Sequence, residues 1–236
     1  MSSKADEIRK LFASTLGKDD VAFMYLGYSG VIVRTGNRAI IIDPADLLKG
    51  EDVKALKGVD LLLFTHSHGD HYNSAVTLDV FKATNASVVA EPLVANDLKG
   101  KIPPNKLTSA QPGKTYAFGE ITVAAVQGVH RGPINLYQIK VGDISIFHGG
   151  DSGYVSVKAY SADLAFLPTG SPSPTASPEY AFNMASELKP SVVVPIHGSA
   201  GQSKEFEAKV KEKMPKTSMI IAEPNVSKVV TLKRKT

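Results

Sequence analysis

Cysteine is absent from the 236 residues of this chain, which excludes disulfide bonds and thiolate metal sites. Long apolar runs are also absent, and no segment reaches the roughly 18 uninterrupted apolar residues that a membrane-spanning helix requires. The charged N-terminal segment, residues 1–7, lacks the apolar core of a signal peptide. A cytoplasmic protein without a membrane partner is therefore expected.

Strong charge imbalance is lacking as well. The formal net charge is +4 and the sequence pI is about 9.0, which suits anionic substrates but falls short of a dense nucleic-acid-binding surface. Apolar residues make up 43% and charged residues 21%, which is ordinary for a globular protein. The length predicts one domain over residues 1–236, with an amphipathic helix in residues 1–20 packed on it. The same helix could instead serve as an adapter for a partner.

The chemistry of the chain is concentrated in the segment His66-Ser67-His68-Gly69-Asp70-His71, which follows the short apolar run 59–64. That run is typical of a buried strand, so one loop at its end carries four potential metal ligands. Imidazole and carboxylate groups are preferred ligands of Zn, Mn and Fe. His66 and His68 leave the same face of an extended segment, whereas Asp70 and His71 follow as the chain turns. This spacing indicates two adjacent metals rather than a polar turn with incidental histidines.

Three further potential ligands also follow apolar strands and stand beside or near glycine. His130 follows the strand 121–129, Asp151 follows 144–148, and His197 follows 192–196. Strand ends and their loops are where α/β proteins build their sites, so we expect these side chains to join the histidine-rich loop. The remaining histidine, His148, lies inside a strand and is interpreted as a core residue or as a hydrogen-bond partner of a ligand.

Asp43 ends the strand 39–43 and precedes a proline. Two interpretations are equally open. Asp43 could accept hydrogen bonds from the histidine-rich loop or from a ligand histidine. It could also serve only as the first residue of an Asp-Pro turn.

The order of elements favours a layered α/β fold. Strands and helices alternate through residue 98, strands dominate from residue 115, and Gly142-Asp143 forms a tight hairpin. Helices are expected at 4–16, 52–57, 74–82, 92–98, 178–188 and 203–213. Strands are expected at 21–27, 31–35, 39–43, 59–64, 87–90, 115–118, 121–129, 134–141, 144–148, 163–167 and 192–196, with a closing pair at 218–222 and 228–232.

Taken together, these motifs resemble those of the metallo-β-lactamase-fold hydrolases, and the chain is most similar to the UlaG-like branch. The segments Tyr25–Gly30, Ile41–Pro44, His148–Tyr154 and Pro190–His197 add to the resemblance, which runs from about residue 21 to 200. It implies a four-layer αββα sandwich that holds two divalent ions, zinc first and manganese or iron as alternatives. It also implies a distribution of ligands: His66, His68 and His130 on one ion, Asp70, His71 and His197 on the other, and Asp151 bridging both. The sequence departs from the branch at Tyr28, where a histidine is common, and in the loop 167–175.

The resemblance therefore implies a dinuclear hydrolase. A metal-bridging hydroxide would cleave a small ester, lactone or phosphodiester, and Asp70 would accept the proton of the attacking water. Loop position makes Tyr28, Arg131 and Ser173 candidates for substrate contact, with a plain surface charge as the alternative for Arg131.

Three other functions stay open at this point. The basic pI suggests a nuclease acting on RNA or DNA as one alternative. Because the sequence shows no long basic insertion or clamp domain, a nucleic-acid partner is not expected. A non-catalytic metal- or ligand-binding protein and a di-iron redox enzyme are the others. The sequence leaves the substrate, the metal and homo-oligomer formation open.

Overall fold

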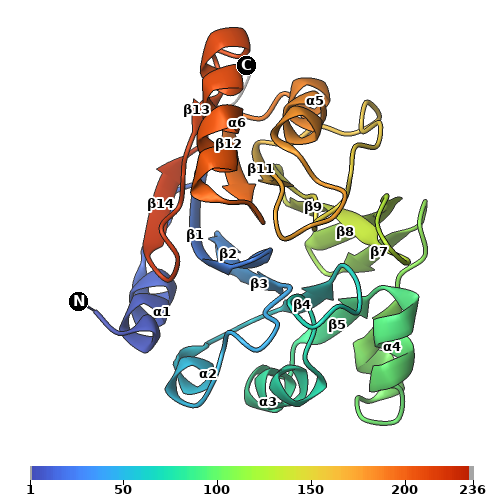
Figure 1. Cartoon of the computed structure of the whole chain (residues 1–236). Coiled ribbons are helices and arrows are strands. Elements are labelled where there is room, and N and C mark those ends of the chain that lie inside the picture. Colours follow the sequence, from blue (N-terminus) through green and yellow to red (C-terminus); the bar gives the residue numbers. More distant parts are fainter. Residues whose placement is uncertain (1, 234–236) are drawn as a thin grey trace. The chain divides into compact units, whose positions relative to one another are not determined.

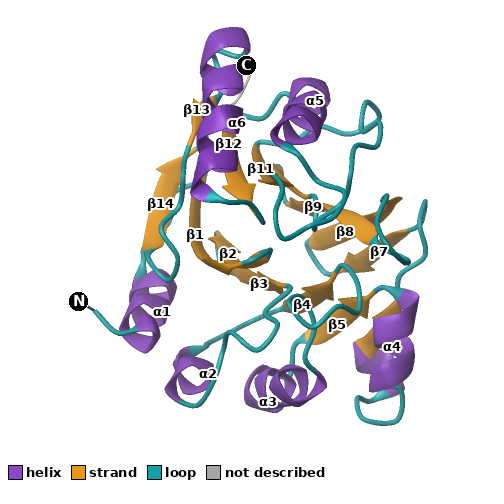
Figure 2. Cartoon of the chain, viewed as in Figure 1, coloured by secondary structure: helices purple, strands orange, loops and turns teal. Residues whose placement is uncertain are grey.

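The computed structural model describes residues 2–233, and contacts within it divide the chain into two compact units. Unit 1 contains residues 2–110 and Glu223–Thr231, and unit 2 contains Gln111–Ala222 and residues 232–233. Each unit has one seven-stranded sheet with its own helices (Figure 1, Figure 2). This confirms the predicted mixed α/β class, whereas a single domain over residues 1–236 stays a prediction.

The sheet of unit 1 has the strand order β14-β1-β2-β3-β4-β5-β6. Its strands are β1 (Asp20–Gly27), β2 (Gly30–Thr35), β3 (Arg38–Ile42), β4 (Leu61–Phe64), β5 (Ser87–Ala90), β6 (Leu107–Ser109) and β14 (Ser227–Thr231). From β3 to β6 all neighbours are parallel. Because parallel strands end at the same edge, the residues that follow β3 and β4 meet there.

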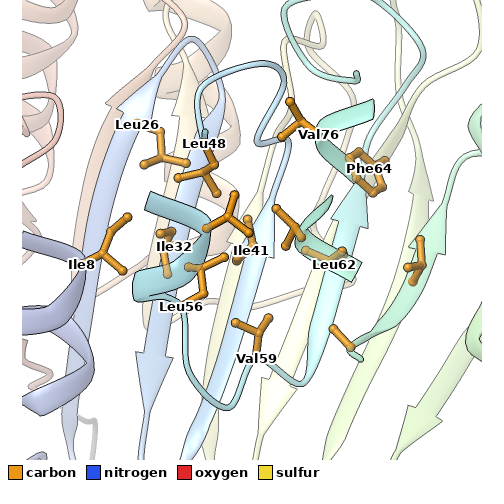
Figure 3. Packing of buried hydrophobic residues seen from close by; sticks show 14 of the residues in the cluster. Ile8, Leu26, Ile32, Ile41, Leu48, Leu56, Val59, Leu62, Phe64 and Val76 are labelled. Atoms are coloured by element: carbon orange, nitrogen blue, oxygen red, sulfur yellow. The ribbon is translucent and has the colours of Figure 1, made fainter. Parts of the chain in front are cut away.

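Four α-helices belong to unit 1: α1 (Lys4–Ala13), α2 (Glu51–Ala55), α3 (Ser74–Thr84) and α4 (Pro92–Leu98), with a short 3-10 helix at Pro104–Lys106. The core beneath them consists of side chains at neighbouring positions of one sheet face, including Ile32, Ile41 and Leu62, and of Ile8 from α1 (Figure 3). All four are fully buried. Each contributes on the order of 1.5–3 kcal/mol relative to an exposed side chain, so the sheet edge rests on a rigid base.

The sheet of unit 2 has the order β13-β12-β11-β10-β9-β8-β7. Its strands are β7 (Thr115–Phe118), β8 (Ile121–Gln127), β9 (Asn135–Val141), β10 (Ile144–His148), β11 (Leu164–Pro168), β12 (Val192–Ile196) and β13 (Ser218–Met219). The expected hairpin at Gly142 joins β9 and β10, and from β10 to β13 the strands are parallel. Helices α5 (Pro178–Leu188) and α6 (Ala200–Lys213) contact β11 and β12, respectively. Phe206, Met184 and Leu167 are buried in this unit's core.

Two expectations from the sequence are wrong in detail. The two closing strands expected at 218–222 and 228–232 are found at Ser218–Met219 and Ser227–Thr231, and they belong to different sheets, since β13 adds to β12 and β14 adds to β1. Their apolar pattern indicates strands but carries no information about the partner strand. Helix α6 begins at Ala200 rather than 203, because Ser199 and Gln202 form a capping box at its start.

Within residues 2–233 no helix combines the length and apolar character needed to cross a membrane.

Candidate metal centre

Four of the predicted ligands lie in unit 1, in the turn that follows β4. His66 and His71 are buried, Asp70 is half-buried and His68 is exposed. The ring centroids of His66 and His68 are 4.6 Å apart, and those of His66 and His71 are 4.0 Å apart. Asp70 Oδ2 lies 3.7 Å from His71 Nε2. The turn therefore gathers three imidazoles and one carboxylate, which we call the first half-set.

Asp43 holds this turn from the end of β3. Its Oδ1 accepts a hydrogen bond from the Thr65 N–H at 2.8 Å, and its Oδ2 accepts one from the Thr65 hydroxyl at 2.6 Å. The same Oδ2 lies 2.8 Å from His71 Nδ1. An ionised carboxylate can only accept hydrogen bonds. Nδ1 of His71 therefore carries the proton, and Nε2 has the free lone pair. Asp43 thus contacts both the loop and His71, a predicted ligand, which agrees with the first of its two interpretations.

The other three predicted ligands lie in unit 2 and form the second half-set. Asp151 follows β10 and is 3% exposed. Its Oδ2 lies 3.5 Å from Nε2 of His130, which follows β8, and 3.8 Å from Nε2 of His197, which follows β12. One carboxylate oxygen thus faces two imidazole nitrogens. A buried carboxylate that faces two imidazoles is favoured when it is paired or coordinates a metal, so this arrangement is suited to a metal ligand.

The glycine beside His197 is required by packing. A Cβ added at Gly198 would lie 2.0 Å from the hydroxyl oxygen of Thr169, so no larger residue fits without a shift. His197 itself has a left-handed backbone with φ of 44°. The tight turn after β12 therefore fixes the direction in which the imidazole leaves the strand.

Two hydroxyls of the loop before α5 hold the backbone of Asp151. The Ser173 hydroxyl donates to the Asp151 carbonyl at 2.6 Å, and the Thr175 hydroxyl donates to the same oxygen at 3.2 Å. Thr175 Oγ1 also lies 3.2 Å from His130 Nδ1. Since a hydroxyl has a single proton, Thr175 accepts at this second contact, and Nδ1 of His130 is the protonated nitrogen. The lone pair of His130 is then on Nε2, the atom that faces Asp151.

The three residues predicted to contact substrate have different surroundings. Tyr28 is 43% exposed and its backbone is left-handed, with φ of 46°. Arg131 is exposed in the loop after His130. Ser173 is 8% exposed, and its hydroxyl is engaged with the Asp151 carbonyl. Substrate contact by these three residues stays a prediction.

Sequence reasoning missed the two threonines that orient the ligands. Thr65 and Thr175 carry no recognisable spacing signal, although Thr65 directly precedes the first ligand histidine. His148 is fully buried in β10, and its Nδ1 accepts a hydrogen bond from the Gly150 N–H at 3.2 Å. This agrees with its interpretation as a core residue.

The donor set fits divalent transition metals. Each of the seven side chains, five imidazoles and two carboxylates, offers an atom that could hold a metal ion. Neutral imidazole and carboxylate suit Zn, Mn and Fe. The contacts from Asp43 to His71 and from Thr175 to His130 are of the kind that fixes the ring orientation of ligand histidines.

Comparison with known proteins places the chain in a family. The family model described as a beta-lactamase superfamily domain matches residues 22–197, which includes all seven predicted ligands. A UPF0173 metal-dependent hydrolase from Thermus thermophilus is 33% identical over 195 residues, covering 75% of this chain and 83% of the relative. A similarly named protein from a Geobacillus species is 34% identical over 203 residues, covering 73% and 83%.

Among solved structures, a metallo hydrolase from Ignicoccus hospitalis has a similar fold, with a TM-score of 0.76. The two sequences are 23% identical, and the match covers 91% of this chain and 100% of that protein. The predicted metallo-β-lactamase fold is thereby confirmed, whereas the assignment to the UlaG-like branch stays a prediction. The chain belongs to the beta-lactamase superfamily and, within it, to the family of metal-dependent hydrolases.

Proposed function

We propose that this chain is a dinuclear hydrolase in which the two half-sets together hold a pair of divalent ions, zinc in the first place. The proposed ligands are His66, His68 and His130 for one ion, Asp70, His71 and His197 for the other, and Asp151 for both. The observation that carries the proposal is the buried Asp151 carboxylate, whose one oxygen lies within 3.8 Å of two imidazole nitrogens. The match of the family model across residues 22–197 supports the joint use of both half-sets.

The bound ions would supply an activated water and would polarise the electrophile of the substrate. The protein groups have separate tasks. Asp70, which is half-buried beside His71, would accept a proton from the attacking water. Asp43 and Thr175 would keep Nδ1 of His71 and of His130 protonated, so that Nε2 of each ring would be the ligand atom.

The proposed substrate is a small ester, lactone or phosphodiester. The net charge of +4 favours an anionic molecule. The proposed substrate contacts are Tyr28, Arg131 and Ser173. Tyr28 and Arg131 are exposed, and the Ser173 hydroxyl also donates to the Asp151 carbonyl. A cytoplasmic location is part of the same proposal, because the chain has no cysteine.

The test combines metal analysis with a substrate panel. Zinc-loaded protein is incubated with lactones, thioesters, phosphodiesters and oligonucleotides, and the metal content of the same sample is measured. Asp151→Ala should abolish turnover of any substrate found and lower the bound metal, while the protein stays folded. Asp163→Asn is the control, because this carboxylate only accepts bonds from Ser145 at the start of β10. Full activity of Asp151→Ala would refute the proposal.

The same panel separates the alternative functions. A nuclease, which the pI of about 9.0 keeps open, would cleave the oligonucleotides and bind them with a steep dependence on salt. A non-catalytic member of the fold would hold metal through the same ligands and turn over no compound in the panel.

A further inference from the structure

Four lysines gather in unit 2, at the amino-terminal ends of β12 and β13. A cavity of about 830 Å³ opens there beside Ser191 and Ser218, which begin or precede these strands. Among the described residues, its lining contains four lysines, Lys189, Lys213, Lys216 and Lys233, and no carboxylate. We call it the lysine cavity. Its volume lies within the range of small-molecule sites, roughly 300–1,000 Å³.

Carboxylates of the described residues compensate little of the charge of the lysine cavity, since Lys213 is only a minor cause of the lowered pKa of Glu179. None of the four ammonium groups of the cavity lies in an ion pair within these residues, although Lys213 is 5.7 Å from the centre of the Phe182 ring. Helix α6 provides the contrast, because Lys209 pairs with Glu179 at 2.7 Å and Lys211 pairs with Glu207 at 2.8 Å. The helix thus changes from paired to unpaired lysines where it reaches the cavity. Four like charges around one hollow favour an anion between them.

Two hydroxyls of the lysine cavity are bonded within the protein. The Ser191 hydroxyl donates to the Lys233 carbonyl at 2.7 Å, and the Thr217 hydroxyl donates to the Pro190 carbonyl at 2.8 Å. The first bond fixes the backbone of Lys233, and Lys189 is fixed as the left-handed cap of α5. The backbone is therefore ordered while the ammonium groups stay available. Met214, Pro190 and Pro215 form an apolar part of the wall.

The lysine cavity is separate from the metal ligands. Ser191 directly precedes β12 and His197 directly follows it. The five residues of this strand span about 17 Å, at roughly 3.3 Å per residue. A ligand in the cavity would thus lie at the opposite end of β12 from the second half-set.

We propose that the lysine cavity binds an organic polyphosphate, of the nucleoside triphosphate class. The lysines would contact the phosphates as point charges that need no fixed geometry. The apolar wall of Met214 and Pro215 would contact the ring of the ligand. This proposal does not depend on the proposed hydrolase function, because none of the metal ligands lines the cavity.

The test is calorimetric titration of the full chain at low salt, without magnesium, using ATP, inorganic tripolyphosphate, adenosine and a short oligonucleotide. The double variant Lys213→Gln/Lys216→Gln removes two charges from the cavity. The matched control Lys114→Gln/Lys204→Gln removes two exposed lysines of the same unit that do not line it. Asp151→Asn reports whether the ligand binds at the metal ligands instead.

We expect ATP to bind more tightly than tripolyphosphate or adenosine. The cavity variant should weaken ATP binding at least about tenfold, and the control and Asp151→Asn less than about twofold. Equal losses in the two lysine variants would mean unspecific charge attraction, and a loss in Asp151→Asn would move the ligand to the metal ligands. Equal affinity for tripolyphosphate and ATP would refute the proposal that the cavity recognises a nucleotide. If an oligonucleotide bound more tightly than ATP, and the cavity variant lost this binding, the ligand of the cavity would be a nucleic acid and the proposed nucleotide would be refuted.

Discussion

The Oδ2 atom of Asp43 lies 2.8 Å from Nδ1 of His71, and both side chains are completely buried. These residues are 28 positions apart in the chain, and the parallel pairing of β3 with β4 brings them together. A buried carboxylate that accepts from an imidazole and from the Thr65 N–H is a strong constraint on the turn. The turn that carries four of the proposed ligands is thus oriented by a residue that is not itself a proposed ligand.

Replacing Asp43 by Asn tests this constraint. Asn tolerates the left-handed φ of 45° at this position, so the backbone should be retained. The amide is a weaker acceptor for His71, and we expect the zinc affinity to fall by about 10- to 100-fold. Competition with a metal indicator measures the affinity, and thermal unfolding checks the fold.

Asp60→Asn is the matched control for Asp43→Asn. Asp60 also lies in unit 1 and accepts from the Ala39 N–H at 2.8 Å and from Arg38 at 3.0 Å, at the start of β4. This variant should lose some stability and keep its zinc affinity. If both variants lost zinc affinity to the same extent, the special role of Asp43 would be contradicted.

The histidine-rich loop was predictable from sequence because its ligands are contiguous and follow an apolar strand. Asp43 was recognised as a candidate because it ends a strand, but the sequence could not decide between a turn residue and a partner of His71. That decision depends on the order of strands in the sheet, which is set by contacts between distant segments. For the same reason the sequence could not tell which sheet each of the closing strands near 218 and 228 joins.

Thr175→Val tests the orientation of His130. The valine keeps the shape of the side chain but removes the acceptor for Nδ1 of His130 and one donor to the Asp151 carbonyl. The nitrogen chemical shifts of His130 should then show a mixture of the two tautomers, and zinc affinity should fall about tenfold. Thr175→Ser, which keeps the hydroxyl, should restore both.

Thr217→Val is the control for Thr175→Val. It removes a hydroxyl of the same unit that bonds the Pro190 carbonyl at 2.8 Å. We expect a cost of about 1 kcal/mol in the free energy of unfolding and no change in the His130 signals. An unchanged tautomer in Thr175→Val would show that the threonine does not orient this ring.

Glu91 predicts a dependence of stability on pH. Its side chain is 1% exposed, Oε2 accepts from the Leu93 N–H at 3.0 Å, and Oε1 has no hydrogen-bond partner among the described residues. Burial raises the pKa of Glu91 above its usual 4.5, against a smaller opposite effect of the Leu93 and Val94 N–H groups. The folded protein therefore retains a proton on Glu91 at pH values where the unfolded chain has lost it.

The contribution of Glu91 to stability is consequently greatest below pH 4.5 and decreases as the pH rises through the raised pKa. Glu91→Gln keeps an oxygen that can accept from Leu93 and removes the buried charge. Its free energy of unfolding should exceed that of the unchanged protein at pH 8 and not at pH 4. Urea titrations at both pH values measure the free energy of unfolding. Glu223→Gln, at an exposed position, is the control. An advantage of equal size at pH 4 and pH 8 would contradict the assignment.

Removing the metal should affect both units, because the proposed centre takes ligands from each. Zinc at about 100 times its dissociation constant should stabilise the native protein by about 2.7 kcal/mol, and a chelator should abolish this gain. Amide hydrogen exchange then locates the effect. Zinc should slow exchange in residues 65–71 of unit 1 and in residues 197–203 of unit 2, and Asp151→Asn should weaken the protection in both. Protection confined to residues 65–71 would mean that the first half-set binds zinc alone, and a centre shared by the two half-sets would be refuted.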